Sequence, residues 1–371
     1  MQPVAAQHIL RALPPGLVFD PFMGGGTVLI EAMRDGRPAI GADASPLAVF
    51  AAAHHTWRPS ETELTQFRAQ ATEMVYAVTK LLPASAVGSE RFLGLERRRQ
   101  GEKASRAESK DAWAALRAAL EQEIAVESVQ MASPSPAWFC FAAAQQLAER
   151  MRYTSPVAVF DSTVHAYCEA LRALRQAAPP ELVASPALLC ADARTVQLPP
   201  STPRVDAILT SPPYAGVYNY MSLARETRAR LAPHGKAPLM GLVGTPEGWS
   251  DPWPEVWRSA REIGARKQLR RLRRERSFYA AYEADQRAWL SAAAAVLRPG
   301  GRAAILIGDG EPEGEEVERG ARARDALEPL VTAADTAGLR FLASATISAA
   351  STGKSLPGKR RPEHLLLVEA R

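Results

Sequence analysis

The stretch Thr-Ser-Pro-Pro-Tyr, residues 210–214, combines a hydroxyl group, two rigid backbone carbonyls and an aromatic ring directly after an apolar run. A proline fixes φ at about −65° and cannot donate to a sheet ladder. It also pushes the residue before it toward an extended conformation. The strand predicted at residues 205–210 must therefore end here, in a stiff loop. Such a loop can hold a small planar group between a fixed carbonyl and an aromatic face.

A second stretch, DPFMGGGT at residues 20–27, lies between a short apolar run and a segment with helical spacing. Glycines let the backbone approach a ligand closely, and a following helix presents free N–H groups. The three glycines do not follow the GxGxxG spacing of dinucleotide-binding folds. Asp43 ends the next predicted strand, where an acid can accept hydrogen bonds from ribose hydroxyls. Asp192 ends a later strand and suits an adenine amino group, with a helix N-cap or a solvated turn as the alternative.

These two stretches carry a resemblance to a known family. DPFMGGGT resembles the DPFxGxGT signature of S-adenosylmethionine-dependent amino-methyltransferases that act on nucleic acids, and TSPPY resembles their catalytic [DNS]PP[YFW] tetrapeptide. ADAR, VLRPGG and the closing PEHLLLVEAR resemble further blocks of the family. The resemblance covers residues 1–56 and 185–371 well and the segment between them poorly.

The resemblance implies methyl transfer from S-adenosylmethionine, by in-line displacement, to an exocyclic amino nitrogen of a base. The Ser211 hydroxyl and the Pro212 carbonyl would accept the two N–H groups of that amine, which is a positional and electrostatic gain. Tyr214 would stack on the base, which must be flipped out of a duplex to be reached. The alternative interpretation of the tetrapeptide is a rigid loop without catalysis.

The residue types also bear on which base is methylated. No cysteine follows a proline, which argues against methylation at cytosine C5. Ser211 makes the tetrapeptide similar to the SPPY form, which is typical of cytosine-N4 methyltransferases. Adenine N6 in DNA and an amino group in tRNA or rRNA are kept as alternatives, and a non-enzymatic nucleic-acid-binding protein is a more distant one. DNA is favoured over RNA as partner, and a restriction or defence partner protein is compatible with this interpretation.

The candidate site residues fall into three groups. The cofactor is expected to be surrounded by Asp20, Pro21, Phe22, Gly24, Gly26, Thr27, Asp43 and Asp192. The base is expected to be held by Ser211, Pro212, Pro213 and Tyr214, with Tyr218, Asn219 and Tyr220 either lining its pocket or packing the loop. Phosphates are expected to meet Arg266, Lys267, Arg270, Arg271, Arg273 and Arg274. Such phosphate contacts give affinity rather than sequence reading, and a solvated helical face is the alternative.

The elements that must position these residues alternate between strand and helix over residues 1–56 and 181–371. This predicts an α/β fold, a Rossmann-like, doubly wound and mostly parallel sheet that ends in an antiparallel edge hairpin. Residues 57–180 carry amphipathic helical patterns around a polar, basic stretch. They predict a mostly helical insertion, which is either a target-recognition region or a cap without a reading role.

Composition limits the classes of protein to which the chain can belong. The chain has 371 residues, of which 47% are hydrophobic, so one large α/β domain with an insertion or two domains can form a core. The net charge of +5 favours a polyanionic partner. Three separated cysteines and six scattered histidines argue against a disulfide scaffold or a metal site, and His54-His55 is interpreted as a surface or strand-edge pair. Without a long apolar run or a signal sequence, a cytoplasmic protein is expected.

Overall fold

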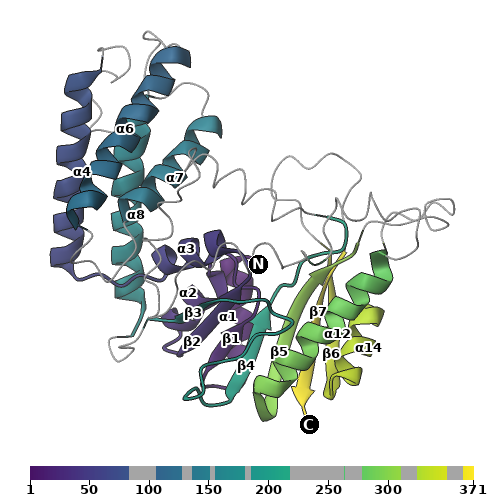
Figure 1. The fold of residues 1–371 in the computed structure, drawn as a ribbon. Helices are drawn as coiled ribbons and strands as arrows, with labels where there is room; N and C mark the ends of the chain where they lie inside the picture. Colours follow the sequence, from purple (N-terminus) through teal and green to yellow (C-terminus); the bar gives the residue numbers. More distant parts are fainter. Residues whose placement is uncertain are drawn as a thin grey trace. The chain divides into compact units, whose positions relative to one another are not determined.

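The chain divides into two compact units in the computed structural model (Figure 1). One unit holds Met1–Thr56 and the described residues from 178 onward, and the other lies within Trp57–Ala177. The residues that the structure describes are 1–82, 106–127, 136–150, 155–179, 185–217, 263, 278–310, 324–348 and 362–371.

A seven-stranded sheet with the order β3-β2-β1-β4-β5-β7-β6 forms the first unit. Its strands are β1 (Val18–Asp20), β2 (Ala39–Asp43), β3 (Ala187–Cys190), β4 (Val205–Thr210), β5 (Leu297–Gly308), β6 (Leu339–Ser348) and β7 (Pro362–Ala370). The strands from β1 to β5 pair in parallel, whereas β7 runs antiparallel to both β5 and β6. The predicted α/β fold, a doubly wound, mostly parallel sheet with an antiparallel edge, is therefore confirmed.

The helices of this unit follow from the strand order. The order reverses between β1 and β4, and crossovers between parallel strands are right-handed. The helices after β1 and β2 therefore cover one face of the sheet, and those after β4 and β5 cover the other. The first group is α2 (Thr27–Arg34) and α3 (Pro46–His55), with α1 (Pro3–Ala12) packed on α2, and the second is α12 (Phe278–Val296) and α14 (Leu327–Thr336).

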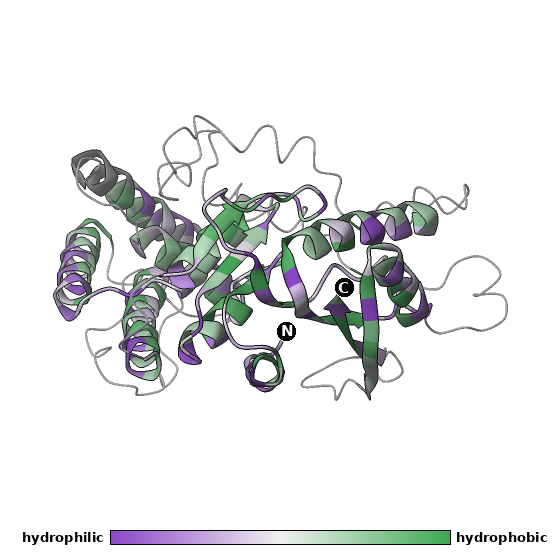
Figure 2. Ribbon diagram, turned by 90° about the horizontal axis from the view of Figure 1, so that it is seen from below, coloured by the Kyte–Doolittle hydropathy of each residue, from purple (hydrophilic) through white to green (hydrophobic). Residues whose placement is uncertain are grey.

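The core of the sheet unit consists of apolar side chains from strands and covering helices. Phe19 of β1 and Ile208 of β4 are fully buried, and Trp289 of α12 is 1% exposed. In Figure 2 the central strands are mostly green, that is hydrophobic, as expected for parallel strands covered on both faces. This buried core holds the strands in place. The loops that carry the candidate residues begin at the ends of these strands and are therefore held as well.

One local feature of β5 differs from the expected pattern. The sequence predicts a helix, a Pro-Gly-Gly turn and then a strand, but in the structure the turn lies inside β5. Val205 of β4 pairs with Leu297, and Ala207 pairs with Arg302, so the strand bulges between these partners. Gly300 adopts a φ of 71° in the bulge, a conformation that glycine tolerates without a Cβ clash.

The second unit is helical. Its helices are α4 (Glu61–Leu81), α6 (Arg106–Glu127), α7 (Pro136–Arg150) and α8 (Pro156–Ala177). Ser60 and Glu63 form a capping box that starts α4, with the Glu63 N–H donating to the Ser60 hydroxyl at 3.2 Å. Trp138 and Phe141 of α7 are fully buried in this unit. Among the described helices of the chain, none has the length and apolar character needed to cross a membrane.

Candidate active site

Asp20 and Thr210 end two adjacent strands at the point where the strand order reverses. Open α/β sheets bind ligands in the crevice at this point. The Thr210 hydroxyl donates to the Asp20 carboxyl at 2.6 Å, and the Phe22 N–H donates to the same oxygen at 3.1 Å. Burial, opposed by these hydrogen bonds, raises the pKa of Asp20 to about 7. Asp20 is therefore a carboxyl group that titrates near neutral pH beside both candidate motifs.

Asp43 joins the end of β2 to the glycine loop, which is residues 21–26 between β1 and α2. One of its carboxylate oxygens accepts the Gly24 N–H at 3.1 Å, and the other accepts the Ser45 N–H at 2.8 Å. Burial raises its pKa to about 6. An ionised carboxylate has about four acceptor sites, so acceptor capacity is left for hydroxyl donors such as those of a ribose.

Gly24 and Gly26 share a left-handed backbone but have different surroundings. Their φ angles are 50° and 84°. A Cβ on Gly24 would meet no described atom within 4 Å, whereas a Cβ on Gly26 would lie 3.2 Å from the Cβ of Ala52. Gly24 therefore leaves open space beside the backbone, where a ligand can approach. Gly26 lets α2 pack closely on α3.

Gly26 is also the N-cap of α2, and Thr27 is the first residue of that helix. Gly26 has no side chain that could accept from the first N–H groups of α2, which leaves this end of the helix open to a ligand on the side of Gly26. Thr27 is half-buried, at the side of the glycine loop. This arrangement suits an anionic or strongly polar group at the loop.

Pro21 and Phe22 attach the start of the glycine loop to the core. Pro21 is buried, and the ring of Phe22 packs edge-to-face on Trp289 with centroids 5.3 Å apart. Phe22 also contacts the cluster that contains Tyr279 and Tyr282. In this structure Phe22 packs on α12 and supports the loop from that side.

The two neighbouring histidines lie at the end of α3 and not at a strand edge. His54 is 1% exposed, and burial lowers its pKa to about 3. His55 reaches the glycine loop, where its Nδ1 lies 2.6 Å from the Gly25 carbonyl oxygen. Sequence reasoning missed this contact, because nothing local in the sequence links a helix end to a loop 30 positions earlier.

Asp192 lies at the end of β3 in a tight turn. Its carboxylate accepts the Arg194 backbone N–H at 2.9 Å and the Arg194 guanidinium at 3.0 and 3.2 Å. Arg194 also donates to Asp285 of α12 at 2.9 Å. These bonds use much of the acceptor capacity of the Asp192 carboxylate. They hold Asp192 in the turn, and its contact with the cofactor stays a prediction.

The tetrapeptide follows β4 and is held at two points. Ser211 is half-buried and Pro212 is buried. The Tyr282 hydroxyl of α12 donates to the Pro213 carbonyl at 3.0 Å, and the Tyr214 hydroxyl donates to the Glu363 carboxylate of β7 at 2.9 Å. The hydroxyl of Ser211 and the carbonyl of Pro212 are thus presented by a loop whose later residues are fixed.

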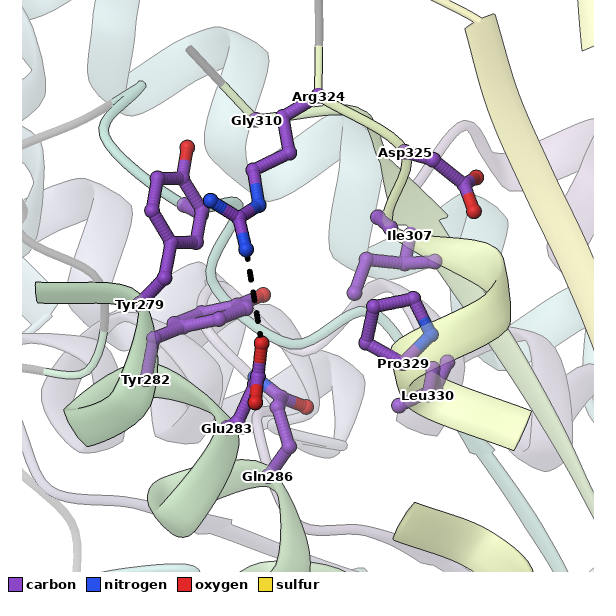
Figure 3. Close-up of a pocket in the computed structure, with 12 residues that line it drawn as sticks. Tyr279, Tyr282, Glu283, Gln286, Ile307, Gly310, Arg324, Asp325, Pro329 and Leu330 are labelled. Carbon is purple, nitrogen blue, oxygen red and sulfur yellow. Dashed lines mark ion pairs between the residues drawn. The ribbon is translucent and has the colours of Figure 1, made fainter. Parts of the chain in front are cut away.

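A small pocket, partly open to solvent, lies beside this loop (Figure 3). Gln286 lines it and is 3% exposed. Its carbonyl oxygen accepts the Trp289 N–H at 2.6 Å, while its amide nitrogen has no hydrogen-bond partner among the residues that the structure describes. At the rim, Arg324 lies 3.7 Å above the centre of the Tyr279 ring. A buried amide donor of this kind is normally satisfied by ordered water or a ligand.

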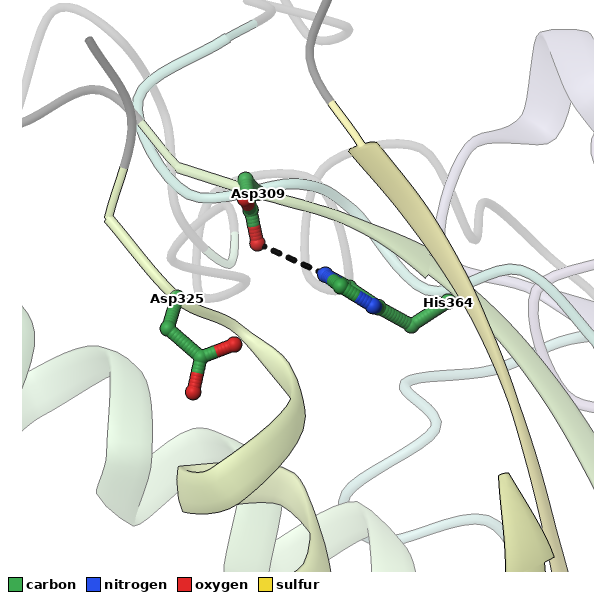
Figure 4. Close-up of side chains that lie close together, drawn as sticks. All are labelled: Asp309, Asp325 and His364. Atoms are coloured by element: carbon green, nitrogen blue, oxygen red, sulfur yellow. Dashed lines mark hydrogen bonds and ion pairs between the residues drawn. The ribbon is translucent and has the colours of Figure 1, made fainter. Parts of the chain in front are cut away.

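Asp309, Asp325 and His364 lie close together at the end of β5 (Figure 4). His364 Nε2 is 2.9 Å from Asp309, and its Nδ1 is 3.1 Å from the Thr346 hydroxyl. The two oxygens of Asp325 accept the first N–H groups of α14. These contacts fasten β5, β6 and β7 to one another and cap α14, which accounts for the cluster without an ion.

The structure brings most of the candidate residues to one edge of the sheet. Asp20, Asp43, the glycine loop and the tetrapeptide lie at the carboxyl ends of β1, β2 and β4. The candidate phosphate contacts Arg266, Lys267, Arg270, Arg271, Arg273 and Arg274 lie outside the described residues, as do Tyr218, Asn219 and Tyr220. Three residues of the site were missed in the sequence, namely His55, Tyr282 and Glu363.

Comparisons with known proteins give little beyond this geometry. No protein-family model and no curated protein matches the chain. Among solved structures, TrmN from Thermus thermophilus aligns with all of this chain at 14% identity and a TM-score of 0.33. The rRNA methyltransferase aviRa from Streptomyces viridochromogenes aligns with all of it at 11% identity and a TM-score of 0.32. The chain covers 49% of the TrmN chain and 85% of the aviRa chain, and at these TM-scores neither likeness carries an argument about function.

Proposed function

We propose that the chain is an S-adenosylmethionine-dependent methyltransferase whose acceptor is an exocyclic amino group of a base in DNA, most favourably cytosine N4. The observation that carries this proposal is the contact between Thr210 and Asp20. It joins the strand end before the Ser-Pro-Pro-Tyr loop to the strand end before the glycine loop. A methyl donor and an amine acceptor held by these two loops would be neighbours, as in-line displacement requires.

The glycine loop and the end of β2 fit the proposed cofactor. Gly24 leaves room beside the backbone, and Asp43 retains acceptor capacity for ribose hydroxyls. The Asp20 carboxyl, when ionised, would favour a positively charged ligand at this edge. Bound S-adenosylmethionine would supply an electrophilic methyl group. Asp192 is the least favourable of the candidate cofactor contacts, because Arg194 already occupies its carboxylate.

The tetrapeptide fits the proposed acceptor. An exocyclic amine is a weak nucleophile because its lone pair is delocalised into the base. The Ser211 hydroxyl and the Pro212 carbonyl would accept its two N–H groups and orient the lone pair toward the methyl group. The Pro213 carbonyl accepts the Tyr282 hydroxyl, which holds the loop just after the Pro212 carbonyl. The surplus proton of the methylated amine would pass to water.

The enzymatic alternatives differ in the acceptor and not in the chemistry. Ser211, in place of an acid, favours cytosine N4 over adenine N6 by resemblance. An RNA base amino group is the next alternative, and a nucleic-acid-binding protein without activity is the most distant one. Restriction and defence partners, and the phosphate-binding role of residues 266–274, are further parts of this proposal.

The test is methyl transfer from labelled S-adenosylmethionine to duplex DNA, single-stranded DNA and bulk tRNA, followed by nucleoside mass analysis. N4-methylcytosine in the DNA digest is the expected result. N6-methyladenine would overturn the choice of base, and label only in RNA would overturn the choice of DNA. A protein that does not bind the cofactor in calorimetry, and transfers no label, would contradict the proposed activity itself.

A further inference from the structure

Tyr214, the last residue of the tetrapeptide, lies across the antiparallel pair of strands β5 and β7. Its hydroxyl donates to Glu363 of β7 at 2.9 Å. Its ring lies over Gly308 of β5, because a Cβ built on Gly308 would be only 2.5 Å from the ring. Gly308 and Glu363 are direct partners in the antiparallel register of β5 and β7. Directly paired residues point to the same face of a sheet, so both meet Tyr214 from one face.

These two contacts have different physical roles. Gly308 leaves room for the Tyr214 ring, since any larger residue would displace it. Glu363 orients the ring, since its carboxylate accepts the phenol O–H and limits the rotation of the Tyr214 side chain. A hydrogen bond from a neutral donor to a carboxylate is stronger than one between neutral groups. Both Tyr214 and Glu363 are half-buried, which limits competition from water.

The side chain of Glu363 is not needed to hold β7 in the sheet. Main-chain pairing with β5 and β6 runs along the strand on both sides. The neighbouring His364 points to the opposite face and contacts Asp309 and Thr346. Among the residues that the structure describes, the hydrogen-bond partner of the Glu363 carboxylate is Tyr214.

We propose that Glu363 is a positioning residue for methyl transfer, which acts by holding the ring of Tyr214 in place for the target base. This inference rests on the proposed function. A ring that is fixed before the base arrives does not have to be ordered during binding, so the cost of aligning the base is lower. β7 is then part of the active site, through one side chain, as well as part of the scaffold.

The test compares Glu363→Ala, Glu363→Gln, Tyr214→Phe and the Tyr214→Phe/Glu363→Ala double variant. Glu363→Ala is expected to lower kcat by about tenfold, the loss of one hydrogen bond to a charged group. Glu363→Gln keeps an acceptor oxygen and should retain activity within about threefold of wild type. The double variant should be no slower than Tyr214→Phe alone, because both changes remove the same contact. The Kd for S-adenosylmethionine should stay the same throughout.

A matched control is available on the same strand and the same face. Glu369 of β7 accepts Arg302 at 3.1 Å and also pairs with Arg340, away from the tetrapeptide. Glu369→Gln should leave kcat unchanged. If Glu363→Ala does not fold, Glu363→Gln and Tyr214→Phe still decide the matter, since a fully active Tyr214→Phe variant overturns the proposal.

A readout without activity separates this inference from the proposed function. In protein labelled with 3-fluorotyrosine, the Tyr214 resonance is identified by its loss in Tyr214→Phe. It should shift or broaden in Glu363→Ala and stay in place in Glu369→Gln. An active wild type with an equally active Glu363→Ala variant, or multiplicative losses in the double variant, would overturn the role of Glu363 alone. A wild type that methylates no nucleic acid would overturn both proposals, even if the resonance responds.

Discussion

Thr210 donates a hydrogen bond of 2.6 Å to Asp20, although 190 positions separate the two residues in the sequence. Thr210 directly precedes the Ser-Pro-Pro-Tyr loop, and Asp20 directly precedes the glycine loop. A shift of either strand would break this buried contact and cost the carboxyl group a donor. The spacing between the two halves of the proposed site is therefore set by the sheet.

The raised pKa of Asp20 predicts a pH-dependent stability. The carboxyl titrates at about 7 in the folded protein and at an ordinary value of 3.8 when unfolded. Between these values the folded state binds more protons, so the contribution of Asp20 to the free energy of unfolding falls as pH rises from about 4 to 7. Asp20→Asn should remove the part of the slope that comes from Asp20 and leave the smaller part that comes from Asp43 between about pH 4 and 6. Urea unfolding of both proteins across this range would measure it, and parallel curves would contradict the prediction.

Ser211→Ala should slow methyl transfer without weakening cofactor binding. The hydroxyl is proposed to contact the amine and not the methyl donor, so its loss should cost about 10- to 100-fold in kcat. The Kd for S-adenosylmethionine, measured by calorimetry, should stay within twofold of wild type. Equal losses in turnover and in cofactor affinity would show that the role given to Ser211 is wrong.

Gly24→Ala and Gly26→Ala should have different effects. Both place a Cβ on a left-handed backbone, which costs roughly 1–2 kcal/mol. Gly26→Ala also forces a contact with Ala52 and should lose more free energy of unfolding. Gly24→Ala fills the open space beside the loop and should lose more cofactor affinity. Calorimetry and urea unfolding on both variants would check the ordering, which a larger affinity loss in Gly26→Ala would reverse.

Tyr282→Phe should loosen the tetrapeptide while the pocket keeps its shape. The variant removes the donor to the Pro213 carbonyl and costs about 1 kcal/mol of stability. With that carbonyl free, the loop is less well ordered, and kcat should fall several-fold. Steady-state kinetics would measure the change, with Tyr279→Phe on the same helix as the control. Equal effects in the two variants would mean that the bond to Pro213 has no special role.

Gly308→Ala tests the space that the ring of Tyr214 occupies. A methyl group at this position would approach the ring to about the 2.5 Å found for a built Cβ, so the ring must move. We expect kcat to fall at least as much as in Tyr214→Phe, and the affinity for the cofactor to stay unchanged. Gly338→Ala, at a glycine where a Cβ meets no described atom within 4 Å, is a control for general loss of stability.

Local patterns predicted the fold class and the positions of the two loops. The double proline after residues 205–210 required a strand to end there, and the structure ends β4 at Thr210. Apolar runs between helical patterns predicted the doubly wound sheet, which is confirmed. These features depend on neighbours in the sequence, so one sequence suffices to read them.

The contacts that define the site could not be read in the same way. Tyr214 meets Glu363 over 149 positions, and Tyr282 meets Pro213 over 69. Such pairs depend on strand register and helix rotation, which no local spacing encodes. Asp192 makes a local contact that was also not predicted, because its carboxylate accepts the N–H of Arg194, two residues away.

The place of β7 has a consequence for the order of assembly. β7 is the last of the described strands along the chain, but it lies between β5 and β6. β6 therefore cannot join the sheet until β7 has been made. During synthesis from the N-terminus, the parallel strands can form first, while β6 has no partner among the described strands until residues 362–370 have left the ribosome. Long-range pairing of this kind is slow. The contact between Glu363 and Tyr214 therefore forms only after β7 has paired with β5, later than the two loops at the ends of the parallel strands.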